Sequence, residues 1–376
     1  MAINLRSPYY TSTAVSNTAY TTLDISIWNG SVTSPVTAQY NLRKSVVGTS
    51  VEVLFEISEL IRDYLDITFD GDYSGQAVWV KTVKTAYDSS STPLVSVPNT
   101  QIAFDGYWYF EEVQLALPSL FITNRELFVL EDNVFRIPIY TSNNPTVVFY
   151  KDGEVIASEV FGSDTGSANQ IKYVSIYGDS VNWDTYQERI LNENGSYEDS
   201  SCLQSFFNSY SIGAVDKITI SDSNGIETIK VNVIEECKYE PKKVTFINKF
   251  GALQDMYFFK KSKENLSIKK ESYKSNIALN YGGYNSTTHV NRDFNVIGNE
   301  SISLSSGYLS EDYNEVFKQL LLSEKVWVTN IIESGEQVLP INVKTSSIAY
   351  KTSVNDKLVD YTIEFDKSFD TINNIR

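Results

Sequence analysis

KVTFINKFGALQDMYFFK, residues 243–260, is the stretch that organises the last third of this chain. It predicts two strands, Val244 to Asn248 and Gln254 to Phe259, with a bend at Gly251, where a positive φ is needed. The stretch holds five aromatic side chains, too many for one solvated hairpin. We therefore expect some of them to be covered by the rest of this segment or by another subunit.

The composition is that of a globular, sheet-rich protein. The chain has 376 residues, 42% of them hydrophobic, with 25 Tyr and 19 Phe, and a chain of this length is expected to hold two or three domains. Its formal charge of −16 at pH 7 argues against a surface that wraps nucleic acid. The exception is Lys238 to Lys274, with ten Lys against four Asp and Glu. This run is either a solvated edge that blocks strand pairing or a basic patch that docks on an acidic neighbour, such as another copy.

Short strands are expected through the first segment, after a polar arm rich in Ser and Thr. Apolar residues alternate over Tyr20 to Trp28, which predicts a half-buried strand. The period then changes to helical spacing over Ser58 to Asp66, which predicts a short amphipathic helix. Further strands are expected at Val51 to Phe55, Ala77 to Thr82 and the aromatic-rich Ile102 to Val113.

Two hairpins mark the middle segment. Val147 to Tyr150 and Glu154 to Ala157 flank an Asp-Gly turn, and Lys217 to Ile220 pairs with Thr228 to Val233. Between the hairpins we expect a helical turn at Asp184 to Leu191 and a polar loop at residues 193–201. Turn signals about every ten residues favour immunoglobulin-like or fibronectin-like sandwiches.

The last segment adds a more convincing helix. Ser310 is its predicted N-cap, and it runs from Glu311 to about Leu322; strands follow at Lys325 to Asn330, Gln337 to Val343 and Tyr361 to Phe365. The predicted fold class is mainly β: two Ig-like or fibronectin-like β-sandwich domains, followed by a C-terminal α+β assembly domain. The predicted boundaries are 1–120, including the arm, 121–237 and 238–376.

No catalytic, cofactor or metal signature stands out. The single histidine, His289, lies in a polar loop, and Cys202 and Cys237 are 35 residues apart with no CxxC, which is typical of buried thiols. Asp70-Gly71-Asp72 lacks the spacing of a calcium loop. We expect no enzyme activity, no cofactor and no metal. The N-terminus has no apolar core of a signal sequence, and no window predicts a membrane span.

Several blocks of the last segment resemble a class of tailed-bacteriophage virion proteins. They are FINKFGALQDMYFF from Phe246, KKESYKS from Lys269, SISLSSGYLSEDYNEVFKQLLLSEKVWV from Ser301 and the C-terminal block from Leu339. The class comprises tail, baseplate or ring components of phages of Bacteroidetes-type hosts, some of them crAss-like. The resemblance covers about 240–376 and implies an assembly domain with no active-site residues to carry over.

The resemblance implies a structural component of a phage tail or baseplate, a homo-oligomeric ring with six- or twelve-fold symmetry. Its partners would be itself and other tail proteins, its location the virion tail, after assembly in the host cytoplasm. We expect no specific nucleic-acid binding, although an acidic subunit would suit a place beside the DNA channel. The residues expected at the subunit interface are five apolar anchors and three electrostatic contacts: Phe250, Tyr257, Phe258, Trp327 and Phe369, with Lys260, Lys261 and Lys263.

Two other functions stay open from the sequence. A receptor-binding or glycan-binding tail module would stack the aromatics of Ile102 to Phe110 and the loop Tyr281 to Asn285 against a surface glycan. A cell-wall-degrading tail enzyme would use paired carboxylates, whose separation a sequence does not reveal.

Overall fold

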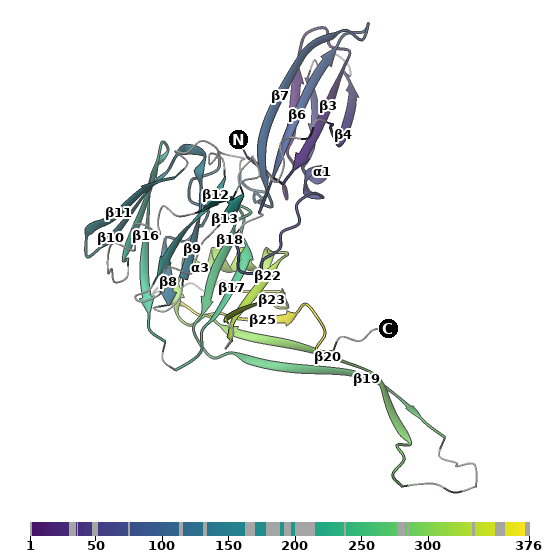
Figure 1. Ribbon diagram of the computed structural model, residues 1–376, viewed down its shortest axis with the longest axis vertical. Coiled ribbons are helices and arrows are strands. Elements are labelled where there is room, and N and C mark those ends of the chain that lie inside the picture. Colours follow the sequence, from purple (N-terminus) through teal and green to yellow (C-terminus); the bar gives the residue numbers. More distant parts are fainter. Residues whose placement is uncertain are drawn as a thin grey trace.

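The computed structural model describes residues 2–372 apart from 30–34, 36, 47–51, 74–75, 113–115, 131–133, 162–169, 178–188, 192–196, 200–214, 237, 277–282, 284–285, 333–334 and 350–357. The described strands form sheets of five, five and seven strands, together with four two-stranded sheets. The chain is therefore mainly β, as the sequence predicts. The N-terminal sheet stands above a body of middle and C-terminal strands, and a two-stranded ribbon extends from that body to one side (Figure 1).

The N-terminal strands form a sandwich. Its larger sheet runs in the order β1 (Ile3–Asn4), β7 (Pro93–Phe104), β6 (Ala77–Tyr87), β3 (Tyr20–Trp28), β4 (Tyr40–Ser45). β5 (Glu52–Glu56) and the helix α1 (Ser58–Arg62) share one buried cluster with this sheet, and β2 (Tyr10–Ala14) pairs with β5. The predicted strand over Tyr20 to Trp28 is confirmed, because Leu23, Ile25 and Ile27 are all buried in that cluster.

The first residues are not a polar arm. Ile3 pairs in parallel with Ala103 at the end of β7, and both Ile3 and Leu5 are buried. The prediction of an arm was wrong because these two apolar side chains fix the N-terminus in the core, despite the Ser and Thr around them.

The predicted strand from Ile102 to Val113 ends at Phe104. Beyond it the chain leaves the sheet, and the Tyr107 N–H donates to the Lys249 carbonyl at 2.8 Å. The backbone hydrogen bonds after Phe104 are thus made with another segment of the chain, which is why the strand stops.

The middle strands form a second sandwich. The five-stranded sheet runs β11 (Glu154–Val160), β10 (Thr146–Lys151), β15 (Lys217–Asp222), β16 (Gly225–Ile234), β8 (Glu126–Leu130), and β9 (Val134–Tyr140) pairs with β12 (Ile171–Tyr177). Both predicted hairpins are confirmed. In the Asp-Gly turn between β10 and β11, φ is 51° at Asp152 and 84° at Gly153. A 3-10 turn, η1 (Thr141–Asn143), follows β9.

The expected helical turn and polar loop of the middle segment are wrong where the structure describes them. β13 (Arg189–Leu191) pairs with β14 (Tyr197–Asp199), so Ile190 and Leu191 are extended and bonded to another strand. The rest of that stretch, and both Cys202 and Cys237, lie outside the described residues.

The C-terminal sheet contains the stretch 243–260. Its seven strands run β18 (Leu253–Phe258), β17 (Lys242–Ile247), β22 (Val326–Ile332), β23 (Gly335–Val343), β25 (Thr362–Lys367), β20 (Asn291–Ser305), β19 (Lys263–Lys274). The predicted hairpin in that stretch is confirmed, and so is the positive φ, 80°, at Gly251.

The predicted C-terminal helix is confirmed as α3 (Tyr313–Leu322), with Val316, Phe317 and Leu320 buried. Its N-cap is Asp312 and not Ser310. Ser310 instead lies in β21 (Leu309–Ser310), which pairs with β24 (Leu358–Val359), so its backbone is held extended before the helix begins.

The three parts share buried residues. One hydrophobic cluster includes Leu127 of β8 in the middle segment and Phe365 of β25. A second cluster combines Trp79 of the N-terminal sheet with Tyr173 of β12 and Trp327 of β22. The parts are therefore packed into one body.

Candidate functional site

Four of the five expected apolar anchors lie inside the chain. Phe250, Tyr257, Phe258 and Trp327 are all buried, and Phe369 is exposed. The expectation that these four side chains contact another subunit is therefore wrong for this fold. The aromatic side chains of residues 243–260 are therefore covered by this chain itself and not by another subunit.

Their partners come from distant parts of the sequence. Phe250 stacks on Phe121 with ring centroids 5.1 Å apart, and Trp327 meets Phe69 edge-on at 5.6 Å. Phe258 packs edge-on against Phe317 of α3 at 6.4 Å. Aromatic pairs at these distances stabilise the fold by more than the burial of their apolar surface alone.

The bend at Gly251 is a docking point between segments. A Cβ at Gly251 would lie 2.8 Å from the backbone nitrogens of Asp105 and Gly106 and from Phe104 Cβ. A Cβ at Gly106 would in turn lie 2.9 Å from the Phe250 carbonyl carbon. Glycine is therefore required on both sides, because the two backbones touch directly.

Tyr73, Arg136 and Asp255 form a buried polar cluster that joins the N-terminal, middle and C-terminal parts of the chain. The hydroxyls of Tyr73 and Thr245 both donate to Asp255 Oδ1, at 2.6 and 2.8 Å. The Arg136 guanidinium lies over the Tyr73 ring at 4.2 Å. Burial raises the pKa of the Tyr73 hydroxyl, and the Asp255 carboxylate beside it raises that pKa further. Tyr73 thus stays protonated and acts as a fixed hydrogen-bond donor.

The lysine run does not form one basic surface. Lys243 and Lys249 are buried, and Lys249 Nζ lies 2.8 Å from Glu112 Oε1. Lys260, one of the expected electrostatic contacts, pairs with Glu236 at 2.8 Å. The expected contacts Lys261 and Lys263 are exposed and make no ion pair with the described residues. Lys242 lies on β17 and pairs with Glu240 at 2.8 Å, whereas Lys269, Lys270 and Lys274 lie on β19, at the edge of the sheet.

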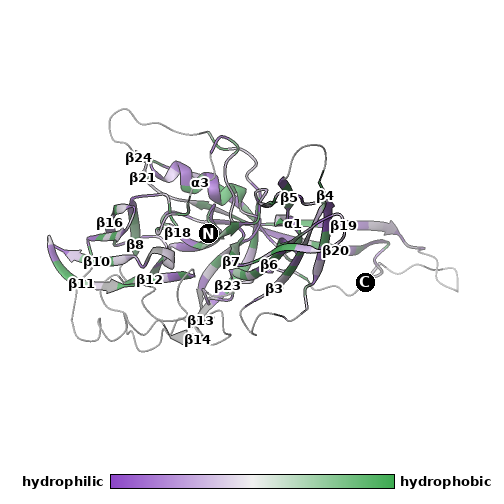
Figure 2. Cartoon of the chain, turned by 90° about the horizontal axis from the view of Figure 1, so that it is seen from above, coloured by the Kyte–Doolittle hydropathy of each residue, from purple (hydrophilic) through white to green (hydrophobic). Residues whose placement is uncertain are grey.

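The ribbon formed by β19 and β20 is the most exposed regular element among the described strands, and we take it as the candidate site. β20 pairs with β25 only from Ser301 to Ser305, so most of β20 extends beyond the sheet, where β19 is the one described strand it pairs with, for example through Ile268 and Gly298. Every residue of β19 is exposed. Both views show the ribbon reaching past the body (Figures 1 and 2).

The ribbon carries apolar side chains on both faces. Leu266 and Ile268 are two residues apart, so they lie on one face; they are 56% and 58% exposed. On the opposite face, Tyr273 and Phe294 meet edge-on at 5.6 Å and are 48% and 45% exposed. Large apolar side chains on a solvent-exposed ribbon are typical of an interaction site.

A bulge bends the ribbon near its middle. Lys269 opposes Ile297 and Glu271 opposes Phe294, so two residues of β20, Asn295 and Val296, oppose one residue of β19. Asn295 has a φ of 53°, a left-handed conformation that Asn tolerates better than most residues. Such bulges increase strand twist and redirect side chains.

The root of the ribbon is fixed by the C-terminal residues. The Thr371 N–H donates to the Gly298 carbonyl at 2.8 Å, and Lys367 donates to Glu300. The hydrogen bond from Lys367 lowers the pKa of the Glu300 carboxyl. Phe369, the exposed anchor expected from the sequence, lies in the segment between Lys367 and Thr371 that follows the ribbon's edge.

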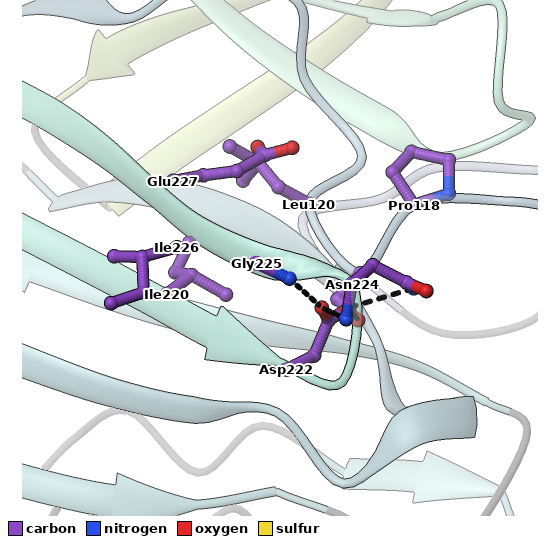
Figure 3. A pocket seen from close by; sticks show the side chains of 9 residues that line it. Pro118, Leu120, Ile220, Asp222, Asn224, Gly225, Ile226 and Glu227 are labelled. Carbon is purple, nitrogen blue, oxygen red and sulfur yellow. Dashed lines mark hydrogen bonds between the residues drawn. The ribbon is translucent and has the colours of Figure 1, made fainter.

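A hollow of about 270 Å³ lies beside the turn between β15 and β16, lined by residues that include Leu120, Ile220 and Ile226 (Figure 3). The two carboxylates in its lining, Asp222 and Glu227, both have partners within the chain. Asp222 Oδ1 accepts from the backbone of Asn224 at 2.7 Å, and Glu227 lies 2.9 Å from Arg125. We assign no ligand to this hollow.

The aromatic stretch Ile102 to Phe110 does not present a stacking platform. Phe104 and Tyr107 are buried, and Phe110 is the one large side chain of the stretch that is fully exposed. The second element of the glycan hypothesis, the loop Tyr281 to Asn285, lies outside the described residues except for Gly283.

Within the described residues no three His, Cys, Asp or Glu side chains are grouped as a metal site requires. The described helices are also too short or too polar to cross a membrane. No protein-family model matches the chain, and no curated protein matches it.

The sequence missed the ribbon. Its signal is present in the alternation of Leu266 and Ile268 with polar residues, and the lysine run was weighed as a sheet edge. The length of the strands could not be predicted, because nothing local marks where β20 leaves the sheet.

Proposed function

We propose that this chain is a structural subunit of a bacteriophage tail or baseplate and works as a homo-oligomeric ring that joins neighbouring tail proteins. The observation that carries the proposal is the projecting ribbon, with Leu266 and Ile268 exposed on one face and Tyr273 and Phe294 on the other. Long strands that extend from a packed body are suited to reaching a neighbouring subunit. The resemblance of residues 240–376 to phage virion proteins supports the same role.

In this proposal the N-terminal and middle sandwiches are Ig-like or fibronectin-like domains, and the C-terminal part is the assembly domain. The role is mechanical: the packed body sets the spacing between neighbours, and the ribbon makes the contact. The acidic charge of the whole chain, −16 at pH 7, would also suit a subunit beside the DNA channel.

An averaged image of intact virions would test this function. We expect the subunit in the tail or baseplate, in six or twelve copies around the axis. A peripheral trimer would favour a receptor-binding module instead, and absence of the chain from purified particles would refute a structural role. Glycan-array binding by the purified protein would likewise move the assignment to the receptor-binding alternative.

A further inference from the structure

The ribbon formed by β19 and β20 lacks cover on either face along most of its length. Isolated two-stranded ribbons are marginally stable in water, and this one exposes five large apolar side chains: Leu266, Ile268, Tyr273, Phe294 and Val296. A partner that covers these side chains would stabilise both the ribbon and the contact.

The distribution of charge indicates which partner fits. Residues 263–305, the two strands of the ribbon and the segment between them, carry five Lys and Arg against four Asp and Glu, a net charge of +1, whereas the whole chain carries −16, which leaves −17 on the remainder. Three lysines of the ribbon, Lys263, Lys269 and Lys274, make no ion pair with the described residues. The ribbon is therefore complementary in charge to the body of the same protein.

The same lysines disfavour the pairing of two ribbons with each other. Lys263, Lys269 and Lys274 lie on the edge strand β19. Like charges brought together along two such edges would repel, and lysine on an edge strand is a common way to prevent strand-to-strand association. The complementary surface is thus the acidic body and not a second ribbon.

The ribbon also points away from its own body in both views (Figures 1 and 2). We infer that the ribbon of one copy binds the acidic body of a second copy, with its apolar side chains covered and its lysines paired across the contact. The two surfaces differ, so the contact is head-to-tail, and it closes into a ring when the rotation between copies closes. This inference rests on the proposed ring and names the surface that builds it.

The test uses the full chain and two matched double variants. Leu266→Ser with Ile268→Ser removes apolar surface from one face of the ribbon. Leu94→Ser with Val97→Ser is the control, because these β7 residues are 40% and 42% exposed but lie on the N-terminal sheet. Circular dichroism and urea midpoints confirm that each variant is folded.

Self-association is measured by sedimentation velocity over a range of concentrations, at about 50 mM and about 500 mM salt. We expect the ribbon variant to weaken association on the order of a hundredfold, and the control variant to leave it unchanged. High salt should weaken the wild-type association, because ion pairs contribute to it. Equal association of the ribbon variant and the wild type would overturn the inference that the ribbon makes the contact.

A photo-crosslinking residue at Ile268 then identifies what the ribbon touches in assembled particles. A crosslink to the body of a second copy supports the inference, whereas a crosslink to a different protein, or to another ribbon, overturns it. A ring that persists in the ribbon variant refutes the role of the ribbon but leaves the proposed ring-forming function standing. A wild-type chain that never self-associates and is absent from particles refutes the proposed function itself.

Discussion

Replacing Gly251 with alanine tests the packing of the bend on which the last third of the chain is built. Alanine at a φ of 80° costs about 1–2 kcal/mol in backbone strain. The new Cβ would also lie 2.8 Å from Phe104 Cβ and from the backbone nitrogens of Asp105 and Gly106, and moving packed backbone apart costs about 1–3 kcal/mol more. We expect Gly251→Ala to lower the free energy of unfolding by about 3 kcal/mol in total.

Gly153→Ala is the matched control. Gly153 has a φ of 84°, but a Cβ there meets nothing within 4 Å, so this variant should lose only the strain, about 1–2 kcal/mol. The assay is urea unfolding followed by tryptophan fluorescence, which reports on this region because Trp28, Trp79 and Trp327 are buried in the adjoining cluster. Equal losses in the two variants would refute the idea that the bend is a backbone-to-backbone joint.

Two further predictions concern buried tyrosines. Tyr73→Phe should lower the free energy of unfolding by about 1–3 kcal/mol, because Asp255 Oδ1 keeps only the donor from Thr245; an unchanged urea midpoint would contradict a stabilising role for the Tyr73 hydroxyl. Burial raises the pKa of Tyr140 to about 12 and also raises the pKa of Tyr313. Because these folded-state values exceed the unfolded value of about 10, their stabilisation is complete below pH ~10 and is lost as pH rises through the folded pKa. Urea midpoints should therefore fall above pH ~10; midpoints that stay flat to pH ~12 would be inconsistent with buried neutral phenols.

Local patterns in the sequence predict much of the secondary structure. The alternation of Leu23, Ile25 and Ile27 marks β3, and Asp152-Gly153 marks the turn of a hairpin, because each signal lies within one element. The prediction of Ser310 as the N-cap was wrong because a distant residue, and not the local sequence, decides its conformation. Its backbone is taken up by pairing with Leu358, a residue far along the chain.

The candidate site shows the same limit more clearly. The density of aromatics around Phe250 is visible in the sequence, but its cover comes from Phe121, more than a hundred residues away, and no local pattern reveals that pairing. The ribbon carried the weaker signal, with Leu266 and Ile268 in a polar, lysine-rich context. The sequence therefore predicted exposure for the wrong apolar side chains. A high density of apolar residues shows how much apolar surface must be buried, but it does not show which part of the chain buries it.

The burial of these aromatics changes the order of events expected for assembly. If Phe250 and Phe258 faced another subunit, the chain would depend on its neighbours to fold, and stability would vary with concentration. Since the chain covers both side chains itself, the body can fold first, and association becomes a separate step made by the ribbon. Under the proposed role, replacing Leu266 and Ile268 with serine should weaken ring formation without lowering the stability of the body, whereas Gly251→Ala should lower that stability while the ribbon stays intact. The two surfaces, one for folding and one for assembly, can therefore be separated by experiment.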